Sequence, residues 1–160
     1  MTDIQLDRIL ILDFGSQYTQ LIARRVREMG VFSEIRAWDI TSDELQDFDP
    51  SGVILTGGPE SVTDGSTAPK APEILFGMGI PVLGICYGMQ TMARQLGGAV
   101  DTCNVREFGY AKVCVEGQSP LFRNVKDHIN PDGRVFLDVW MSHGDKVVEL
   151  PHGLELLAST

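Results

Sequence analysis

The clearest candidate for chemistry in this sequence is Cys86, which follows Gly84 by two residues and precedes Gly88 by two. Residues 80–85 form a short apolar run without charge, which has the length of a buried strand. From residue 87 the apolar spacing becomes helical, and two consecutive glycines at 97–98 end the pattern. Cys86 is therefore predicted to lie where a strand turns sharply into a helix, which is the nucleophile position of a Gly-x-nucleophile-x-Gly elbow.

Such a turn would make the Cys86 sulfur a nucleophile. The flanking glycines leave room for a tight turn, and the start of a helix favours the thiolate, the nucleophilic form of cysteine. The backbone N–H of Tyr87 would face an oxyanion forming at the reacting carbon. The alternative is an inert cysteine in the core, which is a common environment for a free thiol. The strand, the helix, the two glycines and the polar Gln90 one turn later together favour the nucleophile.

A second glycine-containing segment, Gly57-Gly58-Pro59, follows a predicted strand at residues 52–56. Open α/β sheets bind ligands at the carboxyl ends of their strands. In hydrolases with a nucleophile elbow, a glycine-rich loop there supplies the second oxyanion donor. An ordinary turn would explain these three residues when they are taken alone. Beside the Cys86 elbow, we interpret them as the second half of an oxyanion hole.

A cysteine nucleophile needs a base, and histidine is the usual one. The sequence contains three histidines, His128, His143 and His152. His143 lies in a polar segment between Ser142 and Asp145, and it is either this base or a turn residue that shapes a substrate pocket. His128 and His152 lie in polar or proline-containing turns and are predicted to be surface residues.

Up to residue 98 the predicted elements alternate between strands and helices, which indicates a parallel α/β sheet with right-handed crossovers. We therefore expect an α/β fold with an open, mostly parallel sheet that has helices on both faces. A helix is predicted over residues 17–29, and we interpret Ser16 as its cap. After residue 98, turn residues separate short strands and predict a smaller antiparallel part, with strands at residues 99–102, 110–115, 135–141 and 146–150.

The chain is expected to be one domain over residues 1–160, incomplete at its C-terminus, because the last residues resemble a strand without a terminating signal. Acidic residues outnumber basic ones 22 to 13, giving a net charge of −9, which argues against binding to nucleic-acid phosphates. We find neither a signal peptide nor a membrane-spanning stretch in the sequence. Three widely spaced cysteines form neither a disulfide framework nor a metal-binding pattern, so we expect a reduced, cytoplasmic protein without a metal site.

With these motifs assembled, the chain resembles the class I (triad) glutamine amidotransferases. The resemblance extends from about residue 9 to residue 160, and the segments that carry it are 57–59, 84–90 and 141–145. Within the family, residues 13–18 and 106–110 are similar to domains that supply ammonia for the ATP-dependent conversion of XMP to GMP. The resemblance implies a flavodoxin-like fold. It also implies hydrolysis of L-glutamine to glutamate and ammonia through a thioester on Cys86.

The resemblance further implies roles for individual residues. Gly58 and Tyr87 would supply the oxyanion N–H groups, while Gln90, Ser142 and His143 would line the glutamine pocket. His143 would then bind substrate and would not be the base. The family's base and its orienting acid lie in a later His-Pro-Glu motif, which these 160 residues do not contain. We therefore expect the chain as given to lack turnover.

The ammonia would pass to a synthetase domain of the same enzyme that uses ATP and magnesium. These residues do not include that domain, because they contain no Ser-Gly-Gly-x-Asp-Ser stretch. The amidotransferase domain itself is expected to need no cofactor, and the resemblance allows a homodimer of the full enzyme. Two other functions remain open: an independent cysteine hydrolase or peptidase of the same architecture that uses His143 as base, and a non-catalytic binding module.

Overall fold

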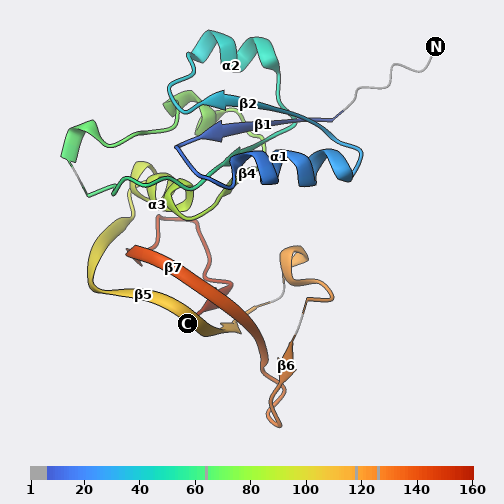
Figure 1. The fold of residues 1–160 in the computed structure, drawn as a ribbon, viewed down its shortest axis with the longest axis vertical. Helices are drawn as coiled ribbons and strands as arrows, with labels where there is room; N and C mark the ends of the chain where they lie inside the picture. Colours follow the sequence, from blue (N-terminus) through green and yellow to red (C-terminus); the bar gives the residue numbers. More distant parts are fainter. Residues whose placement is uncertain (1–6, 64, 118, 126) are drawn as a thin grey trace.

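The computed structural model describes residues 7–63, 65–117, 119–125 and 127–160. Its first half contains a four-stranded parallel sheet in the order β2-β1-β3-β4 (Figure 1). The strands are β1 (Arg8–Asp13), β2 (Phe32–Ala37), β3 (Gly52–Leu55) and β4 (Val82–Gly84). Because the chain runs from β1 outward to β2 and then returns to β3, the strand order reverses between β1 and β3. The carboxyl ends of these two strands are where this type of sheet binds ligands.

In the described part of the chain, three α-helices accompany this sheet: α1 (Thr19–Glu28), α2 (Ser42–Phe48) and α3 (Tyr87–Gln95). Figure 1 shows α1 and α2 on opposite sides of the strands, so the predicted α/β sheet with helices on both faces is confirmed. Two short 3-10 helices, η1 (Gly65–Thr67) and η2 (Glu73–Gly77), lie in the connection from β3 to β4. None of the helices in the described residues is long and apolar enough to cross a membrane.

The core of this half follows from the alternation of side chains along β1. Leu10 and Leu12 are fully buried in one cluster with Leu55 of β3 and Leu45 of α2. Ile11, between them in the sequence, points to the opposite face and is also fully buried. Burying each of these side chains stabilises the fold by about 1.5–3 kcal/mol. The sheet that carries the strand ends is therefore held from both faces.

Residues 99–160 contain a second sheet, which is antiparallel and has the order β6-β7-β5-β8. Its long strands are β5 (Ala99–Val115) and β7 (Val135–Glu149); the others are β6 (His128–Ile129) and β8 (Ala158–Ser159). A 3-10 helix, η3 (Pro120–Phe122), follows β5. The predicted antiparallel part is confirmed, but the prediction of four short strands is wrong, because they are parts of β5 and β7. Polar residues can continue an antiparallel strand that has one solvated face. The pairing of β5 with β7 changes register between Ala99 and Val100 and between Thr102 and Glu107, so each strand continues through these irregular positions.

The start of α1 differs from the prediction that Ser16 caps it. The helix begins at Thr19, and its N-cap residue, Tyr18, makes no side-chain capping bond. In the turn before the helix, Oγ of Ser16 accepts a hydrogen bond of 3.1 Å from the N–H of Tyr18. Oδ1 of Asp13 accepts hydrogen bonds from the N–H of Gly15 (2.9 Å), from the N–H of Ser16 (3.3 Å) and from the hydroxyl of Thr19 (2.7 Å). The last residue of β1 thus organises the turn that follows it, as aspartate commonly does.

Candidate functional site

Cys86 lies between the end of β4 at Gly84 and the start of α3 at Tyr87. Its backbone angles are φ +53° and ψ −114°, and a residue in such a sparsely populated conformation costs on the order of 1–3 kcal/mol. Neighbouring hydrogen bonds hold the turn, including one from the N–H of Gly88 to the carbonyl of Thr56 at 2.9 Å. Cys86 is also exposed. The predicted sharp turn from strand to helix, with its cysteine accessible, is therefore confirmed.

The two elbow glycines are required for space. A Cβ atom at Gly84 would lie 2.6 Å from the Cα of Met89, and one at Gly88 would lie 2.3 Å from the carbonyl oxygen of Leu55. Neither glycine has a positive φ, so backbone freedom does not explain them. The helix that begins after Cys86 can pack directly on β3 and β4 only because these side chains are missing.

The loop after β3 touches the same turn. A Cβ atom at Gly57 would lie 3.4 Å from the Cβ of Cys86, and one at Gly58 would lie 2.4 Å from the carbonyl oxygen of Phe14. The predicted proximity of this loop to Cys86 is thus confirmed. The oxyanion role of Gly58 stays a prediction. So does that of Tyr87, whose backbone N–H lies at the N-terminus of α3 and whose side chain is buried.

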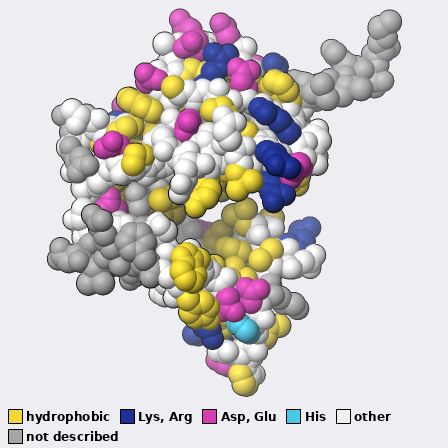
Figure 2. Space-filling view, viewed as in Figure 1, with side chains coloured by type: hydrophobic (Ala, Val, Ile, Leu, Met, Phe, Trp, Pro, Cys, Tyr) yellow, Lys and Arg dark blue, Asp and Glu magenta, His cyan; other side chains and the backbone are white. Residues whose placement is uncertain are grey.

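Cys86 opens into a cleft of about 1200 Å³ that is lined by both halves of the chain. Figure 2 shows this region as a hollow between the upper and lower parts of the molecule. Gly58 and Gln90 line it from the parallel-sheet half, and Ser142 lines it from β7. The structure therefore brings these sequence-predicted residues to one cleft, although they are separated by up to 84 positions along the chain.

The histidines differ in how they relate to this cleft. His128 and His152 are exposed, as predicted, and His128 is hydrogen-bonded through Nε2 to Oδ2 of Asp138 at 2.5 Å. His143 lies within β7, so its interpretation as a turn residue is wrong. Its side chain is outside the described residues, and its role stays a prediction. Within the described part of the chain, no three His, Cys, Asp or Glu side chains are arranged to hold a metal ion.

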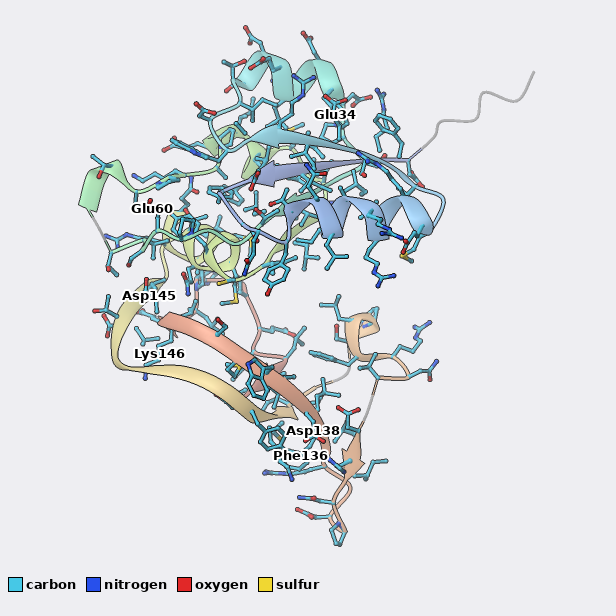
Figure 3. The ribbon with its side chains drawn as sticks, viewed as in Figure 1. Glu34, Glu60, Phe136, Asp138, Asp145 and Lys146 are labelled. Carbon is cyan, nitrogen blue, oxygen red and sulfur yellow. The ribbon has the colours of Figure 1, made fainter. Side chains whose placement is uncertain are left out.

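Gln90 is buried, and its side-chain Nε2 donates a hydrogen bond of 2.9 Å to the backbone carbonyl of Asp145. The carboxylate of Asp145 in turn accepts a bond of 2.5 Å from the hydroxyl of Ser61. Figure 3 shows Asp145 near the end of β7 that lies closest to α3. No role was expected for Asp145 or Ser61 from the sequence. The only signal in the sequence was their position, because Asp145 is the last residue of the 141–145 segment and Ser61 follows the Gly57-Gly58-Pro59 segment by two residues.

We expect Cys86 to be the fastest-reacting thiol of the native protein. Cys114 is partly buried, whereas Cys86 is exposed in the turn before α3, where a reagent can reach its sulfur. The measurement is limiting iodoacetamide at pH 7 with peptide mapping, and labelling in urea controls for intrinsic differences between the peptides. Faster native labelling of Cys103 or Cys114 than of Cys86 would contradict the assignment of the elbow.

We compared the chain with protein-family models, with curated proteins and with solved structures. The glutamine amidotransferase class-I family model matches residues 10–160. The chain is 65% identical over 158 residues to a glutamine-hydrolysing GMP synthase of Cellvibrio japonicus, and the match covers 99% of this chain and 30% of that protein. It is 68% identical over 153 residues to the corresponding protein of Marinobacter nauticus, covering 96% of this chain and 29% of that protein. The chain thus spans about 30% of the length of these relatives.

A solved structure from Thermoplasma acidophilum, described as part of a GMP synthase, superposes with a TM-score of 0.78 at 29% identity. The alignment covers 97% of this chain and 73% of that one. The family model runs through the Cys86 turn, the Gly57-Gly58 loop and β7. The chain therefore belongs to the class-I glutamine amidotransferase family.

Proposed function

We propose that the Cys86 cleft binds L-glutamine and that the Cys86 sulfur attacks its side-chain amide carbon. The S–C bond forms, the amide C–N bond breaks and ammonia leaves with one added proton; water then cleaves the glutamyl thioester to glutamate and restores the thiol. The observation that carries this proposal is the exposed Cys86 in its sharp turn, directly against Gly57. Membership of the family supports the choice of glutamine.

In this proposal the backbone N–H groups of Gly58 and Tyr87 stabilise the oxyanion of the tetrahedral intermediate. One such donor is typically worth about 10²–10³-fold in rate. The close approach of Gly58 to the end of β1 and the position of Tyr87 at the start of α3 support these roles. Gln90, Ser142 and His143 are assigned to binding of the glutamine α-amino and α-carboxylate groups. The lining of the cleft by Gln90 and Ser142 supports this assignment for those two.

We further infer that the ammonia serves the ATP-dependent amination of XMP to GMP. This part of the proposal rests on the relatives, which are named glutamine-hydrolysing GMP synthases and are about three times as long as this chain. The ATP and magnesium would be bound by a synthetase domain, whereas the amidotransferase residues would act without a cofactor. A cytoplasmic location suits a reaction that depends on a reduced Cys86.

Saturating L-glutamine is expected to slow the reaction of Cys86 with iodoacetamide, and D-glutamine is not. A specific pocket should distinguish the two enantiomers because it contacts both the α-amino and the α-carboxylate groups. Peptide mapping of the alkylated protein gives the rate at Cys86, and Cys114 in the same sample is the internal control. Equal protection by both enantiomers, or by neither, would favour a different cysteine hydrolase or a non-catalytic module.

A further inference from the structure

We propose that Asp145 is a positioning residue for glutamine, which fixes the separation between the two walls of the Cys86 cleft. The inference rests on the proposed function, because it concerns the same cleft and the same substrate. Two side-chain hydrogen bonds in the described residues join the parallel-sheet half to β7, and both end on Asp145. One uses its carboxylate and the other its backbone carbonyl.

The carboxylate of Asp145 anchors the loop that contains Gly58. Ser61, three residues after Gly58, donates its hydroxyl proton to Oδ2 of Asp145 at 2.5 Å. The same Ser61 oxygen lies 2.7 Å from the hydroxyl of Thr63 and accepts a bond of 3.1 Å from the N–H of Thr63. Ser61 is therefore held in a local turn when it meets Asp145. A hydrogen bond to an ionised carboxylate is stronger than one between neutral groups, which suits a contact that must fix a loop.

The carbonyl of Asp145 anchors the helix that begins at Cys86. It accepts the bond of 2.9 Å from Nε2 of Gln90, whose side chain is only 5% exposed. Asp145 is also paired with Thr102 of β5, so its backbone is held in the antiparallel sheet. A displacement of this part of β7 would therefore also disturb Gln90.

Three segments with proposed roles in substrate binding thus meet at one residue. They are the Gly58 loop, the first turns of α3, and the segment of β7 that contains Ser142 and His143. A substrate that contacts all three segments needs them in fixed relative positions, because a small displacement of one segment strongly lowers the rate of reaction. Small reagents that do not use the pocket should be insensitive to the same displacement. Loss of Asp145 is therefore expected to affect recognition of glutamine and to spare the intrinsic reactivity of Cys86.

The experiment compares two electrophiles on the 160-residue chain. The chloromethyl ketone analogue of L-glutamine alkylates a thiolate by forming an S–C bond as the C–Cl bond breaks, releasing chloride, and iodoacetamide reacts in the same way with iodide leaving. In Asp145→Ala we expect the analogue to react with Cys86 about tenfold more slowly, the size of effect that loss of one hydrogen bond to a charged group produces. The half-saturating concentration of the analogue should rise more than its limiting rate falls. The iodoacetamide rate should stay unchanged.

Ser61→Ala removes the same hydrogen bond from the donor side, and it is a smaller change that removes no charge. It should also slow the reaction of Cys86 with the glutamine analogue and leave the iodoacetamide rate unchanged. The double variant should lose little more than either single one, because the two residues act through one contact. Asp138→Ala is the matched control. It changes the same residue type on the same strand, but Asp138 bonds to His128 and Tyr110 near the opposite end of β7 (Figure 3), and it should leave both rates unchanged.

The possible results separate this inference from the proposed function. If the wild-type chain shows no preference of Cys86 for the L-analogue over its D-enantiomer, the proposed function itself fails. If the wild type shows that preference and both Asp145→Ala and Ser61→Ala retain the full rate, the positioning role of Asp145 is wrong. If Asp145→Ala slows the reaction with iodoacetamide as much as the reaction with the analogue, Asp145 has a purely structural role. That result would also overturn the positioning role.

Discussion

Replacing Gly88 with alanine is expected to lower the free energy of unfolding by about 3 kcal/mol or more, which is at the upper end of overpacking effects. Alanine is the better helix former by about 1 kcal/mol, so helix propensity alone predicts the opposite sign. The added Cβ would lie 2.3 Å from the carbonyl oxygen of Leu55 and 2.7 Å from its Cβ. Leu55 is fully buried in β3, so α3 would have to move away from the sheet and take the Cys86 turn with it. Urea unfolding gives the change in stability.

Gly77→Ala is the control for this substitution. Gly77 lies in the short helix η2, has no positive φ, and its added Cβ would meet no atom within 4 Å. Its effect should stay within about 0.5 kcal/mol, as for most surface substitutions. Unfolding of the Gly88 and Gly77 variants at the same urea concentration would show that the tight packing of α3 on Leu55 is not the reason for Gly88.

Much of the parallel half could be predicted from the sequence, because its signals are local. The apolar runs around Leu10 and Leu83 both form strands, and paired glycines end the helix after Cys86. The prediction of a buried strand is confirmed for β1 and wrong for β4, because β4 lies at the edge of the sheet and its Leu83 is 45% exposed. The elbow itself was identifiable because Gly84 and Gly88 have a fixed spacing around one reactive residue. The physical reason for these glycines was only partly anticipated. A tight turn was expected, whereas the structure shows that their missing side chains admit the backbones of Met89 and Leu55.

The contacts across the cleft could not be predicted in the same way. The hydrogen bond between Ser61 and Asp145 joins residues 84 positions apart, and no periodicity or spacing records such a contact. The extension of β7 through Ser142 was missed because polar residues and glycine there indicate a turn, whereas pairing with β5 outweighs local preference. Ser16 was wrongly interpreted as the helix cap because the helix begins three residues later, at Thr19. In the intervening turn Oγ of Ser16 accepts a bond from the N–H of Tyr18, and Oδ1 of Asp13 accepts bonds from the N–H groups of Gly15 and Ser16.

The second large effect is expected in catalysis. The 160-residue chain should release glutamate from L-glutamine at least about 10²–10⁴-fold more slowly than a chain that also carries the family's His-Pro-Glu motif, which is the usual contribution of general acid–base catalysis. The leaving ammonia needs a proton, and the water that cleaves the thioester needs a base. These 160 residues contain no His-Pro-Glu, and the resemblance assigns His143 to the substrate pocket. The comparison uses residues 1–160 continued with the following segment of the Cellvibrio japonicus relative, which is 65% identical over the shared part.

Glutamate release is measured for both chains, together with alkylation of Cys86 by the chloromethyl ketone analogue. Alkylation needs the thiolate and the pocket but no proton for a leaving amine, so the short chain should react while it fails to turn over glutamine. Cys86→Ala in the longer chain should abolish both signals and excludes a contaminating glutaminase. Comparable turnover by the two chains would refute the requirement for the later motif. If His143→Ala then removed the activity of the short chain, the base would be His143, and the enzyme would use the residue that this proposal assigns to substrate binding.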